Sequence, residues 1–141
     1  MTTIAYHHGT QTIAYDSRVT AGSQIFTDNE DKKREKDGRV FFLAGNSGDI
    51  DRAVFSFPDQ VELSDNPYGF MVEKGIVYWV SYEDGFPITT KLKHSQSAGS
   101  GGDYALAAMD CGCGAVEAVK VAIGRDVYSG GKVNVFKVDE C

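Results

Sequence analysis

The residue of this sequence that could most directly act as a nucleophile is Thr2, which follows Met1. Once Met1 is removed, Thr2 carries both a hydroxyl nucleophile and a free α-amine, and the amine can take the proton of the attacking hydroxyl. Because a small second residue ordinarily permits removal of methionine, we expect a mature chain that begins at Thr2. Any chain that starts Met-Thr has this potential, so the rest of the sequence must decide whether it is used.

Other reactive side chains do not form a recognisable site. The three histidines and three cysteines lack the spacing of a closed metal site, because the segment 111–113 supplies two thiolates at most. Cys111 and Cys113 are too close for a mutual bridge, and the odd cysteine count favours reduced thiols. The Gly-Ser-Gly-Gly run at 99–102 lacks the lysine and spacing of a phosphate-binding loop. We therefore predict no metal and no cofactor.

Length and charge narrow the function classes. The 141 residues fit one domain, residues 1–141, which is long enough to bury its own core. Basic and acidic residues are intermixed and the net charge is −6, which argues against a nucleic-acid partner. No apolar run approaches the roughly 20 residues that cross a bilayer, and the N-terminus lacks a secretory pattern. We predict a cytoplasmic protein without a membrane partner.

The elements that must position Thr2 begin with two hairpins. Residues 3–6 and 11–15 predict paired strands, and residues 24–27 continue in an extended conformation. A tight turn at 36–39 leads into the apolar run 40–44, which is typical of a strand buried on both faces.

The rest of the chain predicts helices around a second group of strands. Asp49 is expected to cap a short helix from Ile50 to Phe55 that Pro58 ends. The further expected elements, in chain order, are a loop at 58–69, strands at 70–72 and 76–80 with turns at 74–75 and 83–85, a loop at 95–102, a helix at 104–109 capped by Asp103, a helix at 115–123 ended by Gly124, and a strand at 132–138. The order of elements predicts an α+β layered domain.

Four segments behind Thr2 resemble motifs of one family, in the same order. Residues 16–22, Asp-Ser-Arg-Val-Thr-Ala-Gly, resemble the Asp-Ser-Arg-Ala-Thr-Ala-Gly segment of proteasome β-subunits. Residues 43–45, Leu-Ala-Gly, resemble their Met-Ala-Gly element, and residues 99–105 resemble Gly-Ser-Gly-x-x-Tyr-Ala, with an even closer match to the bacterial relative HslV. Residues 125–134 resemble Arg-Asp-Ala-Tyr-Ser-Gly-Gly-x-Val-Asn. The resemblance extends over nearly the whole chain.

This resemblance implies an N-terminal-nucleophile (Ntn) hydrolase sandwich of αββα type and a threonine-type endopeptidase. Thr2 is then the nucleophile and its α-amine the general base. Asp16 would hold a lysine that favours the neutral amine, because two ammonium groups in one site repel. The family's spacing places that lysine at Lys32, with Lys33 as the alternative one register step away. Adjacent strand residues point to opposite faces, so only one of the two can serve.

Further roles follow from the same resemblance. Gly45 matches the position whose backbone N–H forms the oxyanion hole, where a missing side chain lets a carbonyl approach. The auxiliary residues that surround the threonine amine and the active-site water would be Ser100, Asp126 and Ser129. The substrate-binding positions would be Val19, Thr20 and Leu43, and they imply an apolar residue before the cleaved bond.

The sequence departs from the family between its second and third motifs. The family has two long helices there, whereas this chain has only residues 50–61 and a polar loop, so one helix layer should be reduced. A sheet face left to water is costly, so we expect a neighbouring subunit to cover it. The aromatic residues that could mark this contact, or be buried within one chain, are Phe55, Phe57, Tyr68 and Phe70.

The implied partners are a polypeptide substrate, further copies of the chain in a homo-oligomer or ring, and an ATP-dependent unfoldase. One alternative is a catalytically inactive proteasome-like subunit that assembles with or modulates another protease. Another is an Ntn amidase that acts on small amides, which would share Thr2 without requiring the motif at 125–134.

Overall fold

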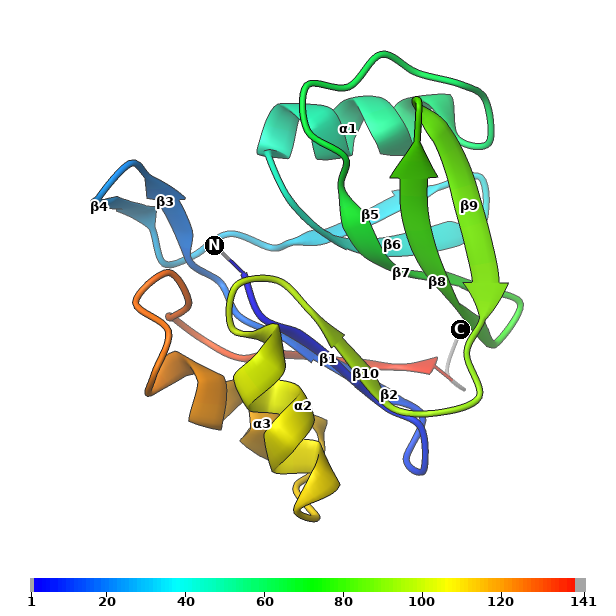
Figure 1. Ribbon diagram of the computed structural model, residues 1–141. Coiled ribbons are helices and arrows are strands. Elements are labelled where there is room, and N and C mark those ends of the chain that lie inside the picture. The colour runs from blue at the N-terminus through cyan, green and yellow to red at the C-terminus, as the bar shows by residue number, and fades with distance from the viewer. Residues whose placement is uncertain (1, 139–141) are drawn as a thin grey trace.

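The secondary structure of residues 2–138, the part of the chain that the computed structural model describes, consists of 11 strands and 3 helices (Figure 1). The strands are β1 (Ile4–His7), β2 (Thr12–Tyr15), β3 (Val19–Ala21), β4 (Gln24–Thr27), β5 (Lys33–Lys36), β6 (Arg39–Ala44), β7 (Tyr68–Glu73), β8 (Ile76–Glu83), β9 (Phe86–Lys91), β10 (Gln96–Ala98) and β11 (Asn134–Lys137). The helices are α1 (Ser47–Ser56), α2 (Gly102–Asp110) and α3 (Ala115–Ile123). The α+β class predicted from the sequence is confirmed.

The four-stranded sheet holds the first strand of the chain between two neighbours. Its order is β10–β1–β2–β11, and each neighbouring pair is antiparallel. The predicted hairpin of β1 and β2 is therefore confirmed. Because side chains alternate along a strand, the large Ile4 and Tyr6 share one face of β1 while the small Ala5 takes the other. Thr2 consequently stands just before a strand that is fixed on both sides.

The five-stranded sheet is a meander in the order β5–β6–β7–β8–β9. Its tight turns at 37–38, 74–75 and 84–85 all have positive φ at both residues, the conformation that favours two-residue hairpins. The predicted turns in these places are confirmed. Strand β6 is the apolar run expected to be buried on both faces, and Phe41 through Ala44 are all buried.

Three core clusters show how these elements are layered. The first cluster lies between the two sheets and includes Tyr15 and Phe42. The second joins Ala14 on the opposite face of the four-stranded sheet to α2 and α3. The third joins Leu43 on the outer face of the five-stranded sheet to α1. The order through the molecule is thus a helix pair, two sheets and a single helix (Figure 1).

The outer face of the five-stranded sheet is covered by the chain itself. Alongside α1, residues Phe57, Val61 and Leu63 of the following segment pack on the third cluster. The expectation that a neighbouring subunit must cover this face is therefore wrong for the part over β6 to β8. The short helix α1 and the long loop that follows it take the place of the two long helices that the resemblance implied.

The aromatic residues singled out from the sequence divide into two groups. Phe70 is fully buried and Phe57 is half-buried. Phe55 and Tyr68 are 74% and 38% exposed. Phe70 thus belongs to the core, and the two exposed rings are the ones that remain accessible.

The first residues of α1 and α2 differ from those predicted from the sequence. Asn46, not Asp49, caps α1, because its side chain accepts hydrogen bonds from the backbone of Gly48 and Asp49. Helix α2 begins after Gly101, so Asp103 lies in its first turn instead of capping it. Helix α3 spans the predicted residues and ends at Gly124 as expected.

Two short strands, β3 and β10, were not predicted from the sequence. Strand β10 occupies part of the predicted loop 95–102, because its three residues pair with β1. Strand β3 pairs with β4 in a separate hairpin that projects from the body of the molecule (Figure 1). Among residues 2–138, no helix is both long and apolar enough to cross a membrane.

Candidate active site

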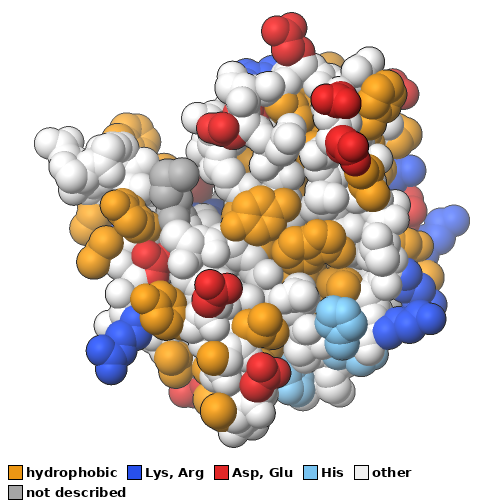
Figure 2. Space-filling view, in the orientation of Figure 1, with side chains coloured by type: hydrophobic (Ala, Val, Ile, Leu, Met, Phe, Trp, Pro, Cys, Tyr) orange, Lys and Arg blue, Asp and Glu red, His pale blue; other side chains and the backbone are white. Residues whose placement is uncertain are grey.

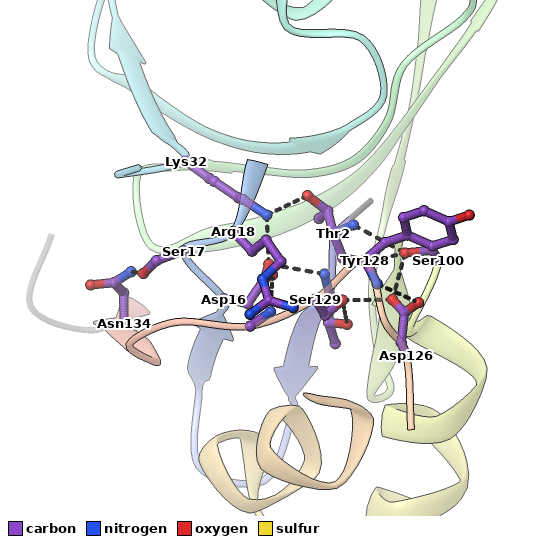
Figure 3. A network of polar contacts seen from close by, with 12 residues as sticks. Thr2, Asp16, Ser17, Arg18, Lys32, Ser100, Asp126, Tyr128, Ser129 and Asn134 are labelled. Atoms are coloured by element: carbon purple, nitrogen blue, oxygen red, sulfur yellow. Dashed lines mark hydrogen bonds and ion pairs between the residues drawn. The ribbon is translucent and has the colours of Figure 1, made fainter. Parts of the chain in front are cut away.

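The buried side chains of Thr2, Asp16 and Lys32 come from separate segments and lie together (Figure 3). Lys32 Nζ lies 2.6 Å from Thr2 Oγ1 and 2.6 Å from Asp16 Oδ1. Asp16 has no exposed surface, and Thr2 and Lys32 each retain 7%. The ammonium group of Lys32 thus links the threonine hydroxyl to a carboxylate out of contact with bulk water.

The ends of three strands bring these residues together. Thr2 lies just before β1 and Asp16 just after β2, so the hairpin register sets them side by side. The backbone N–H of Thr3 donates to Asp16 Oδ1 at 3.1 Å, and that of Gly130 donates to Asp16 Oδ2 at 3.0 Å. Lys32 comes from the other sheet, just before β5. The site therefore lies where the two sheets meet.

The structure distinguishes between the two lysines that the sequence left open. Lys33 forms an ion pair with Glu35 at 3.3 Å, and its side chain is 33% exposed. Lys32 alone of the two contacts Thr2 and Asp16. The opposite directions of neighbouring side chains at the start of a strand account for this difference.

Burial changes the proton affinity of the lysine. Desolvation lowers the pKa of Lys32 below its ordinary value of 10.5, and the attraction and hydrogen bond of Asp16 offset only part of this effect. The ion pair still favours the ammonium form, which can donate to an oxygen that gains negative charge. Lys32 is thus suited to stabilise an alkoxide at Thr2 Oγ1.

A second polar network lies on the amine side of Thr2 (Figure 3). The backbone N–H of Thr2 donates to Ser100 Oγ at 3.1 Å, and Ser100 Oγ donates to Asp126 Oδ2 at 2.6 Å. Ser129 Oγ donates to the same carboxylate oxygen at 2.6 Å and lies 2.7 Å from Thr3 Oγ1. Ser100 thus contacts the nitrogen of Thr2 directly, whereas Ser129 reaches the site through Thr3.

Asp126 is the anion at the base of this network. Burial acts to raise its pKa, but the hydrogen bonds from Ser100, Ser129 and the backbone N–H of Tyr128 outweigh burial and hold the pKa below its usual value. A carboxylate that stays ionised orients the Ser100 hydroxyl so that its lone pairs face the nitrogen of Thr2. A protonated amine at Thr2 would therefore be stabilised here.

Glycines allow the chain to approach Thr2 closely. A Cβ on Gly99 would lie 2.1 Å from the carbonyl oxygen of Thr2, and a Cβ on Gly101 would lie 2.0 Å from Thr3 Oγ1. Gly45, directly after β6, has a φ of 142°, which side chains rarely tolerate. The predicted oxyanion position thus has a backbone conformation that favours glycine, and it lines the same cavities as Thr2.

A cavity of about 210 Å³ opens beside Thr2 and is lined by the predicted substrate-binding residues. Val19 and Thr20 of β3 and Leu43 of β6 all line it. Glu30 and Arg34 also line it, and they form a 3.5 Å ion pair with each other. Sequence analysis did not foresee these two charges, because a charged run shows no sign of which members face inward.

Sequence analysis also missed the positioning role of Thr3. Its fully buried hydroxyl joins Ser129 to the N-terminal strand. Thr3 belongs to a short run of strand-forming residues and has no motif of its own. Only the alternation of side chains along this strand, in which Thr3 and Ile4 point to opposite faces, could have indicated that Thr3 points inward. Every site residue that the sequence did predict lies in one of the two networks or lines the cavity beside Thr2.

No group of three or more His, Cys, Asp or Glu side chains among residues 2–138 is arranged to hold a metal ion. Cys111 and Cys113 are free thiols, and the predicted free thiol of Cys141 lies outside the described residues. A comparison with protein-family models and with curated proteins found no match to this chain.

The arrangement can perform one kind of chemistry with its own residues. The Thr2 hydroxyl contacts a lysine ammonium, and the nitrogen of the same residue is held by a serine that donates to a carboxylate. Such a site can activate an oxygen nucleophile and stabilise the negative charge that forms during attack on a carbonyl.

Proposed function

We propose that this protein is a threonine-type endopeptidase whose nucleophile is Thr2 after removal of Met1. The observation that carries the proposal is the contact of Lys32 Nζ with both Thr2 Oγ1 and Asp16 Oδ1, each at 2.6 Å. A buried ion pair is costly to assemble unless the fold holds it in place. Its contact with a threonine hydroxyl next to the chain start is best explained by catalysis.

The proposed reaction has an acyl-enzyme intermediate. Thr2 Oγ1 attacks the carbonyl carbon of a peptide bond, the α-amine of Thr2 takes the hydroxyl proton, and Lys32 stabilises the attacking oxygen. The backbone N–H of Gly45 is proposed to stabilise the oxyanion. The C–N bond then breaks, the leaving nitrogen receives the proton, and water hydrolyses the ester to regenerate Thr2.

The layer order supports assignment of the fold to the Ntn-hydrolase αββα sandwiches, with the layer over the five-stranded sheet reduced to α1. The four motif segments that resemble proteasome β-subunits and HslV all lie at this site or next to it. Leu43 and Val19 line the cavity beside Thr2, which supports an apolar residue before the cleaved bond. Glu30 and Arg34 form an ion pair there, so the two charges on the cavity wall offset each other.

Assembly and location belong to the same proposal. We propose a cytoplasmic homo-oligomer that receives polypeptide from an ATP-dependent unfoldase, as the resemblance implies. Phe55, 74% exposed on α1, is an available apolar contact for such assembly.

Covalent labelling tests the proposal. Intact mass first measures how much of the purified protein lacks Met1, and a peptide epoxyketone is then added, because its two electrophilic carbons require a neighbouring hydroxyl and amine. We expect one adduct on Thr2 of the methionine-free protein. Thr2→Ala should give none, whereas Thr10→Ala, which changes an exposed threonine outside the site, should label normally.

Two results would contradict the proposal. If the native protein fully retains Met1, Thr2 has no free amine and the mechanism fails. If methionine-free protein forms no adduct, the inactive subunit that assembles with or modulates another protease becomes the better explanation.

A further inference from the structure

A second cavity, of about 310 Å³, adjoins Thr2 in addition to the 210 Å³ cavity. Both cavities are lined by Thr2 and Gly45. Only the smaller includes Lys32, and only the larger includes Ser100. The nucleophile and the proposed oxyanion position therefore stand between two separate spaces, one on the hydroxyl side and one on the amine side of Thr2.

Proton transfer indicates which half of a substrate each cavity would hold. The leaving nitrogen must collect the proton that the Thr2 α-amine takes from the hydroxyl, so this nitrogen must lie near the amine. The nitrogen of Thr2 is held by Ser100, which lines the larger cavity. The half of the substrate that leaves first therefore belongs in the larger cavity, and the acyl half belongs in the smaller one.

The lining of the larger cavity is mainly apolar, whereas the lining of the smaller cavity includes charged residues. The lining of the larger cavity includes Tyr68, Tyr128 and Ala44, and no acidic or basic residue among residues 2–138 lines it. The tyrosine rings are 38% and 43% exposed. On this side of the molecule, hydrophobic side chains gather where the two sheets meet (Figure 2).

One of these rings is held in place before any ligand binds. The Tyr68 hydroxyl accepts a hydrogen bond from the backbone N–H of Gly99 at 3.2 Å, and its ring packs on Trp79 with centroids 5.9 Å apart. Tyr128 is anchored through its backbone N–H, which donates to Asp126. Fixed aromatic walls bind an apolar side chain with little loss of conformational entropy.

We propose that the cavity between Tyr68 and Tyr128 binds the residue on the amine side of the cleaved bond and selects an aromatic or large apolar side chain. This inference rests on the proposed peptidase function and adds the selectivity of the leaving half. It also assigns Tyr68 and Tyr128 a role in substrate binding.

Acyl transfer to added amines tests this inference separately from the chemistry. A fluorogenic peptide amide first acylates Thr2, and an amino-acid amide then competes with water for the ester. Its nitrogen bonds to the acyl carbon, the ester C–O bond breaks, and the amine's proton returns to Thr2. The ratio of transfer product to hydrolysis product, measured by mass spectrometry, reports binding in the leaving-half cavity.

We expect phenylalanine amide and leucine amide to give ratios about tenfold above those of glycine amide and aspartic acid α-amide. Tyr68→Ala and Tyr128→Ala should each reduce this preference to about twofold, and either variant suffices if the other does not fold. Tyr104→Ala is the matched control, because Tyr104 is 46% exposed on α2 and lines neither cavity. It should keep the full preference.

Equal partition among the amines, with acylation of Thr2 intact, would overturn the inference and leave the proposed function standing. Loss of the preference in Leu43→Ala, with both tyrosine variants unaffected, would also overturn it, because the halves of the substrate would then be exchanged. If Thr2 is not acylated at all, the proposed function fails and the inference fails with it.

Discussion

The half of the molecule built on the four-stranded sheet and the half built on the five-stranded sheet contribute unequally to the candidate site. The first half supplies Thr2, Asp16, Ser100, Asp126 and Ser129, which hydrogen bonds link to one another directly or through Thr3. Half of the hydrogen bonds in this network are fully buried, and most of them involve a backbone atom. It therefore holds the reacting atoms in one geometry.

The five-stranded half supplies Lys32, Gly45 and Leu43, each next to or within a strand of the meander. In the proposed mechanism these residues contribute one charge, one backbone N–H and part of the wall of a cavity. The difference suggests that chemistry is concentrated in the half with α2 and α3, and that the half with α1 completes and shapes the site. Substitutions in each half test this division of roles.

The largest effect is expected at Lys32, a cation from the five-stranded half that contacts Thr2 and Asp16 of the other half. Lys32→Ala should lower kcat/KM by about 10²–10⁴-fold, the usual range for loss of a group that acts on proton transfer or developing charge. Because the Lys32 ammonium repels a second ammonium, its removal should also raise the pKa of the Thr2 amine. The rising limb of the pH–rate profile, which reports that amine, should shift to higher pH.

Lys33→Ala provides the matched control, since Lys33 pairs with Glu35 and lies away from Thr2. It should leave both the rate and the pH–rate profile unchanged. Disappearance of the rising limb in Lys32→Ala would instead show that Lys32 itself accepts the proton, which would move the base into the five-stranded half.

The next largest effect is expected at Asp16, in the four-stranded half. Asp16→Asn leaves the buried Lys32 ammonium without its counter-charge and places an amide near the donors of Thr3 and Gly130. Removal of one partner of a buried pair costs about 3–5 kcal/mol of unfolding free energy. Denaturant unfolding should show this loss together with loss of peptidase activity.

Glu117→Gln is the control for the Asp16 variant, because Glu117 pairs with Lys120 at 3.6 Å on an exposed helix surface. An exposed pair of this kind contributes about 0–1 kcal/mol. A change at Asp16 no larger than that at Glu117 would mean that the four-stranded half does not depend on its ion pair.

A smaller effect, on selectivity, is expected in the 210 Å³ cavity. Among peptides that differ only in the residue before the cut, apolar residues should be cleaved fastest, and Leu43→Ala should reduce kcat/KM for the leucine peptide by about tenfold. Val121→Ala, a change to a 45% exposed residue of α3, should not. Fastest cleavage after acidic or basic residues would show that Glu30 or Arg34 dominates the cavity.

The sequence predicted much of the four-stranded half because its signals are local. The alternation in β1 and β2 follows from the residue types themselves, and glycines mark the close approach of the chain to Thr2. Strand β10 was not predicted, because its residues Gln-Ser-Ala carry no strand pattern and become a strand only by pairing with β1. Pairing between distant segments is not visible in a local window.

The five-stranded half was harder to predict at the level of side chains. Its hairpins were correct, because an Asp-Gly or Lys-Gly pair suits a turn that requires positive φ. The choice between Lys32 and Lys33 depended on where β5 begins, and the inward orientation of Glu30 and Arg34 depended on tertiary packing. Neither is encoded in the spacing of a charged run.

The smallest effect is expected where the five-stranded half compensates for its short helix. Asp49 is fully buried and accepts hydrogen bonds from the backbone N–H groups of Ser64 and Asp65, both at 3.0 Å, and from Arg52. These bonds hold the pKa of Asp49 below its ordinary value of 3.8. A carboxyl with a lowered pKa stabilises the fold above its unfolded pKa, and this contribution is lost as the pH falls through the folded pKa.

Asp49→Asn should therefore lower Tm at pH 7 by loosening the loop over the sheet, while epoxyketone labelling of Thr2 continues. The difference in Tm between the original protein and the variant should narrow as the pH falls below 3.8. Asp59→Asn, at an exposed residue of the same loop, should change Tm little at any pH. If Asp49→Asn abolished labelling without unfolding the protein, the outer loop would be coupled to the nucleophile, and the division between a half for chemistry and a half for shape would not hold.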